Sequence, residues 1–275
     1  MTPVSKVAGS ATAKSFRSLL ASPELCKARS LLDHTESCLY VCLQFQPFQT
    51  PRWFTLCRKP EHETLPYVTR NKNKKKSSGY VLATVPSPHP PPVGISSLVA
   101  VGSNIYNISG YKSPSSFSIF DCMSYTWREA PSLPMELRTA SAGVLDGKIY
   151  VWHVGNSSDR EVVAYNPKEG KWNPVESEMR SYTDSYDYCE IENVLYAVYM
   201  TPQGTDEFRW YDTEMAVLWE EHFNYTEHDE KMIRCAVVTL ERGKNGEISG
   251  KVEWVDHVLT VPIICTLQKV LVATI

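Results

Sequence analysis

Long apolar stretches are absent from this sequence of 275 residues. No segment approaches the run of about 20 apolar residues that a membrane-spanning helix needs, and residues 1–15 lack the apolar core of a secretory signal. These absences argue against a membrane partner and favour a cytoplasmic or nuclear location, or both. One alternative stays open: residues 1–23 hold Lys, Arg, Ser and Thr but no acidic residue, which is loosely similar to an organelle transit peptide.

Motifs for metal binding and catalysis are also missing. The 8 Cys include no C-x-x-C pair or zinc spacing, so we expect buried thiols in a reducing compartment. The 7 His show no metal-ligand spacing, and the sequence has no G-x-S-x-G, Walker or G-x-G-x-x-G motif. We therefore predict no enzyme activity, no cofactor and no metal site. The glycosylation sequons at Asn107, Asn156 and Asn224 are interpreted as chance matches.

A broad basic field is absent as well, because the formal net charge is −3. The one cluster of positive charge is Arg70–Lys76 (RNKNKKK), followed by a proline-rich stretch that ends at Pro92. We predict a basic, proline-rich loop over residues 70–92. A nuclear import signal and a nucleic-acid contact are the alternatives, but no aromatic platform accompanies the charges, so no nucleic-acid partner is predicted.

Aromatic residues, in contrast, are plentiful and regularly spaced. They make up 11% of the chain, with 7 Trp and 15 Tyr, which favours an all-β protein. Three segments, GSNIY, DGKIY and ENVLY, end in tyrosines 44 and 46 residues apart, and each is followed by an aromatic-Asp/Asn step and then a tryptophan with nearly the same period. The blade-marker residues are Tyr106, Trp127, Tyr150, Trp172, Tyr196 and Trp219.

Each repeat predicts a β-propeller blade of four strands, since two strands meet at a tight turn and two more follow. The clear repeats span about residues 95–139, 140–184 and 185–230. We expect the Tyr and Trp markers to fill the space between neighbouring blades as core residues rather than to bind a cofactor.

The flanking segments predict further, degenerate blades. Ser37–Phe45 alternates apolar and polar residues and can pair with Trp53–Cys57. Near the other end, Cys235–Leu240 and Lys251–Val258 form two expected strands joined through Asn245-Gly246. A last strand, Lys269–Ile275, can close the ring beside an N-terminal strand. The expected propeller, residues 35–275, has about five blades.

With these residues in hand, the chain resembles the plant F-box/kelch-repeat proteins. Kelch blades carry a tyrosine after a glycine-turned strand and a tryptophan about twenty residues later, as in Tyr106 and Trp127. Four further segments look like parts of that subfamily: SFRSLLASPEL, RSLLDHTESCLYVCL, PRWFTLCRKP and GKVEWVDHVLTVP. The kelch Gly-Gly pair is replaced by Ser109-Gly110 in the first copy and is lost in the later copies.

The resemblance implies an F-box ahead of the propeller, a helical bundle that binds the Skp-type adaptor of an SCF ubiquitin ligase. Only its tail, Lys14–Leu25, is recognisable, and we expect residues 1–34 to be this residual tail, helical or partly disordered. Phe16, Leu19 and Leu20 lie at i, i+3 and i+4, on one face of the expected helix, and are the candidate adaptor-binding residues.

The function implied by the resemblance is target recognition for the ligase, with the kelch propeller binding an unknown target protein. The alternative is an interaction scaffold, or a near-inactive family member, that no longer recruits the ligase because its F-box is incomplete. A third hypothesis is a metal-dependent specifier-type enzyme, but no Glu has an Asp four residues later, so the E-x-x-x-D-x-x-x-H motif is absent. Target contacts are expected in Ser109–Ser116, Gly155–Asp159 and Thr201–Thr205, which follow equivalent strands.

Overall fold

Every regular element that the computed structural model describes is a β-strand. The described residues are 36–46, 51–58, 79–87, 90–92, 98–109, 116–133, 140–154, 160–175, 186–191, 194–199, 207–211, 214–222, 229–242 and 248–275. Their strands are β1 (Ser37–Phe45), β2 (Pro51–Arg58), β3 (Tyr80–Thr84), β4 (Leu98–Val101), β5 (Asn104–Ser109), β6 (Ser116–Asp121), β7 (Thr126–Glu129), β8 (Ala140–Leu145), β9 (Lys148–Val154), β10 (Arg160–Asn166), β11 (Lys171–Val175), β12 (Tyr186–Ile191), β13 (Val194–Tyr199), β14 (Glu207–Tyr211), β15 (Glu214–His222), β16 (Glu230–Arg242), β17 (Ile248–Pro262) and β18 (Cys265–Thr274). Within these ranges there is no helix with the length and apolar composition needed to cross a bilayer.

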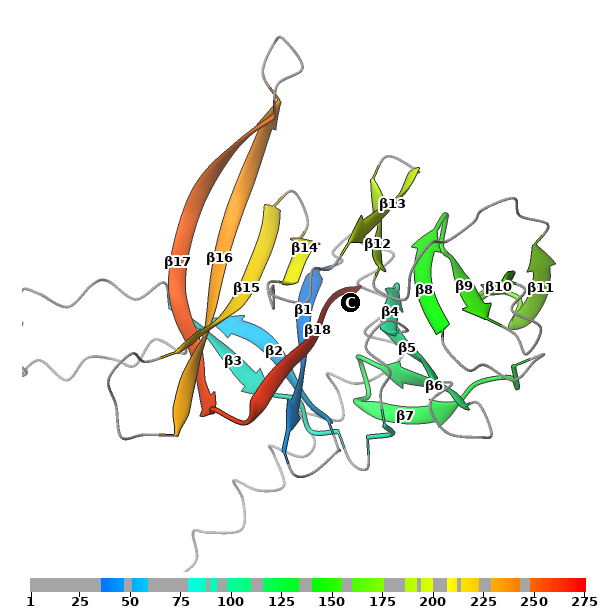
Figure 1. Cartoon of the computed structure of the whole chain (residues 1–275), viewed down its shortest axis with the longest axis horizontal. Helices are drawn as coiled ribbons and strands as arrows, with labels where there is room; N and C mark the ends of the chain where they lie inside the picture. The colour runs from blue at the N-terminus through cyan, green and yellow to red at the C-terminus, as the bar shows by residue number, and fades with distance from the viewer. Residues whose placement is uncertain are drawn as a thin grey trace, which may run out of the picture.

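The strands form five antiparallel sheets, shown side by side in Figure 1. Four have four strands: the closing sheet β18-β1-β2-β3, the second sheet β4-β5-β6-β7, the third sheet β8-β9-β10-β11 and the last sheet β14-β15-β16-β17. The hairpin sheet has only β12 and β13. The end strands β14, β18, β4, β8 and β12 contact one another in succession, as the innermost strands of propeller blades do. The predicted all-β, propeller-type fold is confirmed, and the helical tail predicted for residues 1–34 lies outside the described residues.

The closing sheet joins the two ends of the described chain. β18 pairs along the whole of β1, from Ser37 opposite Thr274 to Phe45 opposite Cys265. Beyond the pair, Glu36 and Ile275 exchange backbone hydrogen bonds of 2.9 and 2.8 Å. The predicted pairing of the last apolar strand with an N-terminal strand is confirmed, as is the pairing of β1 with β2.

The alternation of side chains along β1 explains why both faces of the closing sheet are apolar. Leu39, Val41 and Leu43 enter the core shared with the last sheet, whereas Tyr40 and Cys42 enter the core shared with the second sheet. A third core lies between the second and third sheets. These three cores hold four neighbouring sheets together, and side chains of the closing strands β1 and β18 belong to two of them.

A β-bulge in β18 changes which of its side chains point into each of the two cores beside the closing sheet. The register with β1 shifts between Cys42 and Leu43, where Gln268 has no partner residue in the pairing. Before the bulge Cys265 and Leu267 face the last sheet, and after it Val270 does so while Leu271 and Ala273 face the second sheet. One inserted residue therefore reverses the alternation without exposing an apolar side chain.

The aromatic-Asp/Asn step of the repeats is a turn signal. Asp121 Oδ1 accepts hydrogen bonds from the amides of Met123 and Ser124 (2.8 and 3.3 Å), and Asn166 Oδ1 accepts one from Lys168 (3.1 Å). Each turn then needs a left-handed residue, Tyr125 (φ 56°) or Gly170 (φ 66°).

This four-residue turn sets the spacing of two sequence markers. It places Trp127 directly opposite Phe120 in the β6–β7 pair and Trp172 directly opposite Tyr165 in the β10–β11 pair. The common period of the two markers is therefore a consequence of local turn geometry.

The third repeat departs from the predicted blade. Its first two strands, β12 and β13, pair only with each other among the described strands, and its next two, β14 and β15, belong to the last sheet. Tyr211 pairs with Glu214, so the turn after the Tyr211-Asp212 step is shorter than in the other copies. Trp219 consequently lies within β15, opposite Arg234, rather than near the start of a strand and opposite an aromatic residue.

The predicted loop over residues 70–92 is also corrected. Tyr80–Thr84 within it is strand β3, paired with β2. Leu82 is buried, and the ring of Tyr80 stacks on that of Trp254 with centroids 4.9 Å apart. The prediction failed because the lysines before Tyr80–Thr84 and the prolines after it are typical of a loop, although the five residues between them form a strand.

Replacing Phe120 by Ala is expected to destabilise the protein by about 3 to 5 kcal/mol, the cost of removing a buried aromatic ring. Phe120 is fully buried and lies 5.1 Å from Trp127 and 6.0 Å from Trp53, measured between ring centroids. Urea unfolding followed by tryptophan fluorescence measures the loss. Val255→Ala, at a side chain that is 45% exposed, is the control and should change stability by less than about 1 kcal/mol.

Candidate protein-interaction faces

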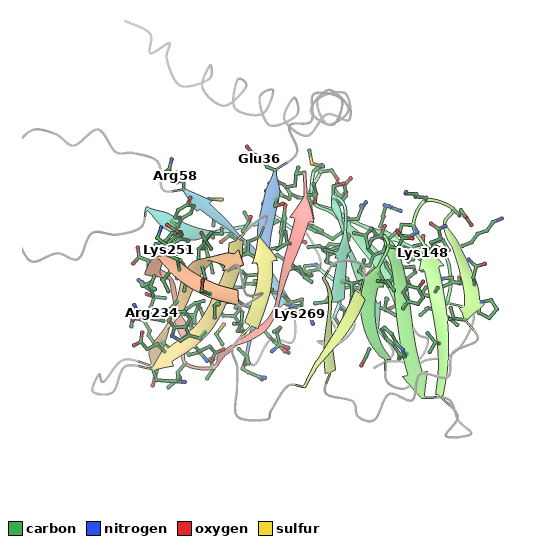
Figure 2. The ribbon with its side chains drawn as sticks, turned by 90° about the horizontal axis from the view of Figure 1, so that it is seen from above. Glu36, Arg58, Lys148, Arg234, Lys251 and Lys269 are labelled. Carbon is green, nitrogen blue, oxygen red and sulfur yellow. The ribbon has the colours of Figure 1, made fainter. Side chains whose placement is uncertain are left out.

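The antiparallel strands give the sheets two opposite ends. At one end, the amide of Thr274 donates to Gly102 O (3.0 Å) and that of Cys122 to Ser103 O (2.9 Å). These bonds bring the end of β18, the β4–β5 turn and the β6–β7 turn together, and Glu36 lies there too through its bonds to Ile275. We call this end the terminal face. Figure 2 shows Glu36, Arg58 and Lys148 toward this end of their sheets.

The opposite end, the loop face, carries the connections between the second and third strands of the sheets. The β5–β6 connection is bounded by the pair Ser109 and Ser116, and the β9–β10 connection by the pair Val154 and Arg160. The β13–β14 connection follows the equivalent strand of the third copy. A strand of six residues rises about 20 Å, which is the approximate separation of the two faces.

The predicted target-binding loops therefore begin and end on one face. Within the three predicted ranges, only Ser109 and Ser116 are described. Residues 110–115, Gly155–Asp159 and Thr201–Thr205 lie outside the described residues, as do the candidate adaptor-binding residues Phe16, Leu19 and Leu20. Their roles stay predictions.

Two of the marker tryptophans link neighbouring sheets. Trp127 Nε1 donates a 2.7 Å hydrogen bond to Ser87 Oγ, in the connection from the closing sheet to the second sheet. Trp172 Nε1 points in the same way to Pro131 O (3.5 Å), in the connection from the second to the third sheet. Their rings lie 5.1 and 5.0 Å from those of Phe120 and Tyr165. Each indole thus links the outermost strand of its sheet, β7 or β11, to the segment that connects this sheet with the preceding one.

The other markers have different surroundings. Tyr106 is buried in the core between the second and third sheets, and the ring of Tyr150 lies 6.5 Å from that of Trp152. Tyr196 lies in β13, where only the backbone is described. Trp219 has the guanidinium of Arg234 over its ring, 5.7 Å from the centroid.

A buried ion pair at the start of β16 connects the last sheet to the closing strand. Lys231 Nζ donates to Glu220 Oε2, and the two side chains are 5% and 6% exposed. The other carboxylate oxygen, Oε1, accepts a 2.7 Å hydrogen bond from the amide of Leu267 in β18. Sequence reasoning missed this contact, because Leu267 is 47 residues from Glu220 and no local pattern relates them.

Burial keeps the core cysteines protonated. Desolvation raises the thiol pKa of Cys122 and of Cys235 to about 12, and that of Cys265 to about 11. It raises the pKa of Cys42 further still. Since the thiolate is the nucleophile and metal ligand, these four side chains are packing residues at neutral pH. No three His, Cys, Asp or Glu side chains in the described part of the chain come together as a metal-binding group.

Asn107, the first of the three sequons, is fully buried in β5. Its Nδ2 donates a 2.9 Å hydrogen bond to Pro92 O. A glycan on this amide is incompatible with the folded sheet.

Comparisons with known proteins agree with the arrangement of sheets. A family model described as the FKB95 kelch-repeats domain matches residues 53–161, from β2 into β10. A putative F-box/kelch-repeat protein of Arabidopsis thaliana is 53% identical, over 95% of this chain and 88% of the relative. Two further F-box/kelch-repeat proteins of the same plant are 43% and 46% identical, over 97% and 95% of this chain and 94% and 85% of their own lengths. The chain belongs to the plant F-box/kelch-repeat family.

Within this family the chain is short for the span that it matches. The first two F-box/kelch-repeat alignments extend over 321 and 352 positions, more than the 275 residues of the chain. These relatives therefore have residues inside the matched span that this chain lacks. The family model ends within the third sheet, and the divided third repeat lies beyond it.

Lys231→Met is expected to destabilise the protein by about 3 to 5 kcal/mol, because it leaves the buried Glu220 carboxylate without its cation. The double variant Lys231→Met, Glu220→Leu should recover part of this loss. Chemical denaturation of all variants measures both effects. In the control Lys251→Met, the affected pair with Glu253 is 69% and 34% exposed, so the change should stay below about 1 kcal/mol. Equal losses at the two sites would contradict the role of burial.

Stability is expected to fall as the pH rises above about 9, because an unfolded thiol ionises near its ordinary pKa of 9.0 while the buried thiols stay protonated up to about 11 or 12. The stabilisation is complete below the unfolded pKa and is lost as the pH approaches the folded value. Urea midpoints between pH 7 and about 10.5 measure this decline. Cys235→Ala should lower stability at every pH but flatten the decline, and an unchanged slope would argue against the thiols as its cause.

Proposed function

We propose that this chain recognises target proteins for an SCF-type ubiquitin ligase through its kelch propeller. Its membership of the F-box/kelch-repeat family supports a protein-interaction role based on the kelch repeats. The F-box in the relatives' names supports a Skp-type adaptor as the second partner. The proposed site of action is the cytoplasm, the nucleus or both.

The separation of the two faces carries this proposal. The described chain begins at Glu36 on the terminal face, whereas the connections bounded by Ser109 and Ser116 and by Val154 and Arg160 lie on the loop face. A target held on the loop face would therefore lie at the opposite end of the sheets from Glu36, the first described residue.

The proposed mechanism is positioning. The propeller holds the target close to a charged ubiquitin-conjugating enzyme, which converts ubiquitin transfer from a bimolecular step into an effectively intramolecular one. The rigid cores between the sheets maintain that geometry. The proposal assigns no catalytic residue to this chain.

A second candidate function is an interaction scaffold that does not recruit the ligase. One observation favours it: the F-box/kelch-repeat relatives have residues within the matched span that this chain lacks. The loop face would then bind its partner without ubiquitin transfer.

Adaptor binding separates the two functions. If the ligase function holds, the purified full chain should bind a plant Skp-type adaptor saturably in biolayer interferometry. Phe16→Ala and Leu20→Ala should each weaken binding at least about tenfold, since each removes a large apolar side chain from the proposed contact. Ser18→Ala, on the opposite side of the expected helix, is the matched control. A chain with no measurable adaptor binding would leave the scaffold as the function.

A further inference from the structure

We draw no further inference here: the strongest candidate, the exposed apolar pair Ile263 and Ile264 in the turn between β17 and β18 on the loop face, carries nothing because nothing in the structure shows what covers it.

Discussion

The pairing of β1 with β18 is the contact on which the rest of the described structure depends. It joins residues 220 to 237 positions apart, and closing so long a loop costs conformational entropy. The compensation comes from burial on both sides. Side chains of the two strands enter the cores shared with the last and the second sheets, so one strand pair fixes two interfaces at once. The Glu220 carboxylate adds a polar link, since it accepts a hydrogen bond from Leu267 of β18.

Features that arise from local geometry could be predicted from the sequence. The second and third sheets follow the repeat because Asp121 and Asn166 build the same four-residue turn, and that turn brings Trp127 and Trp172 opposite an aromatic residue. Those two sheets require information only from residues that are close in sequence. Ring closure was predicted as well, although β1 and β18 are distant in sequence, because the repeats imply a propeller and Lys269–Ile275 is an apolar segment that can close it.

Other features that depend on distant partners could not be predicted. The third repeat has the same aromatic-Asp step, yet Tyr211 pairs with Glu214, and β14 and β15 join the last sheet. The spacing of the marker residues predicts strands and turns, but it does not predict which sheet those strands join. Strand β3, the bulge at Gln268 and the Lys231–Glu220 pair belong to the same class, because each is defined by residues on another strand. The candidate adaptor-binding residues and target loops fall mainly outside the described residues, so their roles remain predictions.

The divided repeat and the closing sheet lie at different places in the ring, and this separation explains how the chain can keep a folded core despite the defect. In repeat architectures each unit is stabilised mainly by its immediate neighbours. The three cores connect the last, closing, second and third sheets in an unbroken series, and the described residues of these cores include none from the hairpin sheet. The closing and second sheets therefore each take part in two described cores, whereas the third sheet shares one core with the second sheet and also contacts the hairpin sheet through β8.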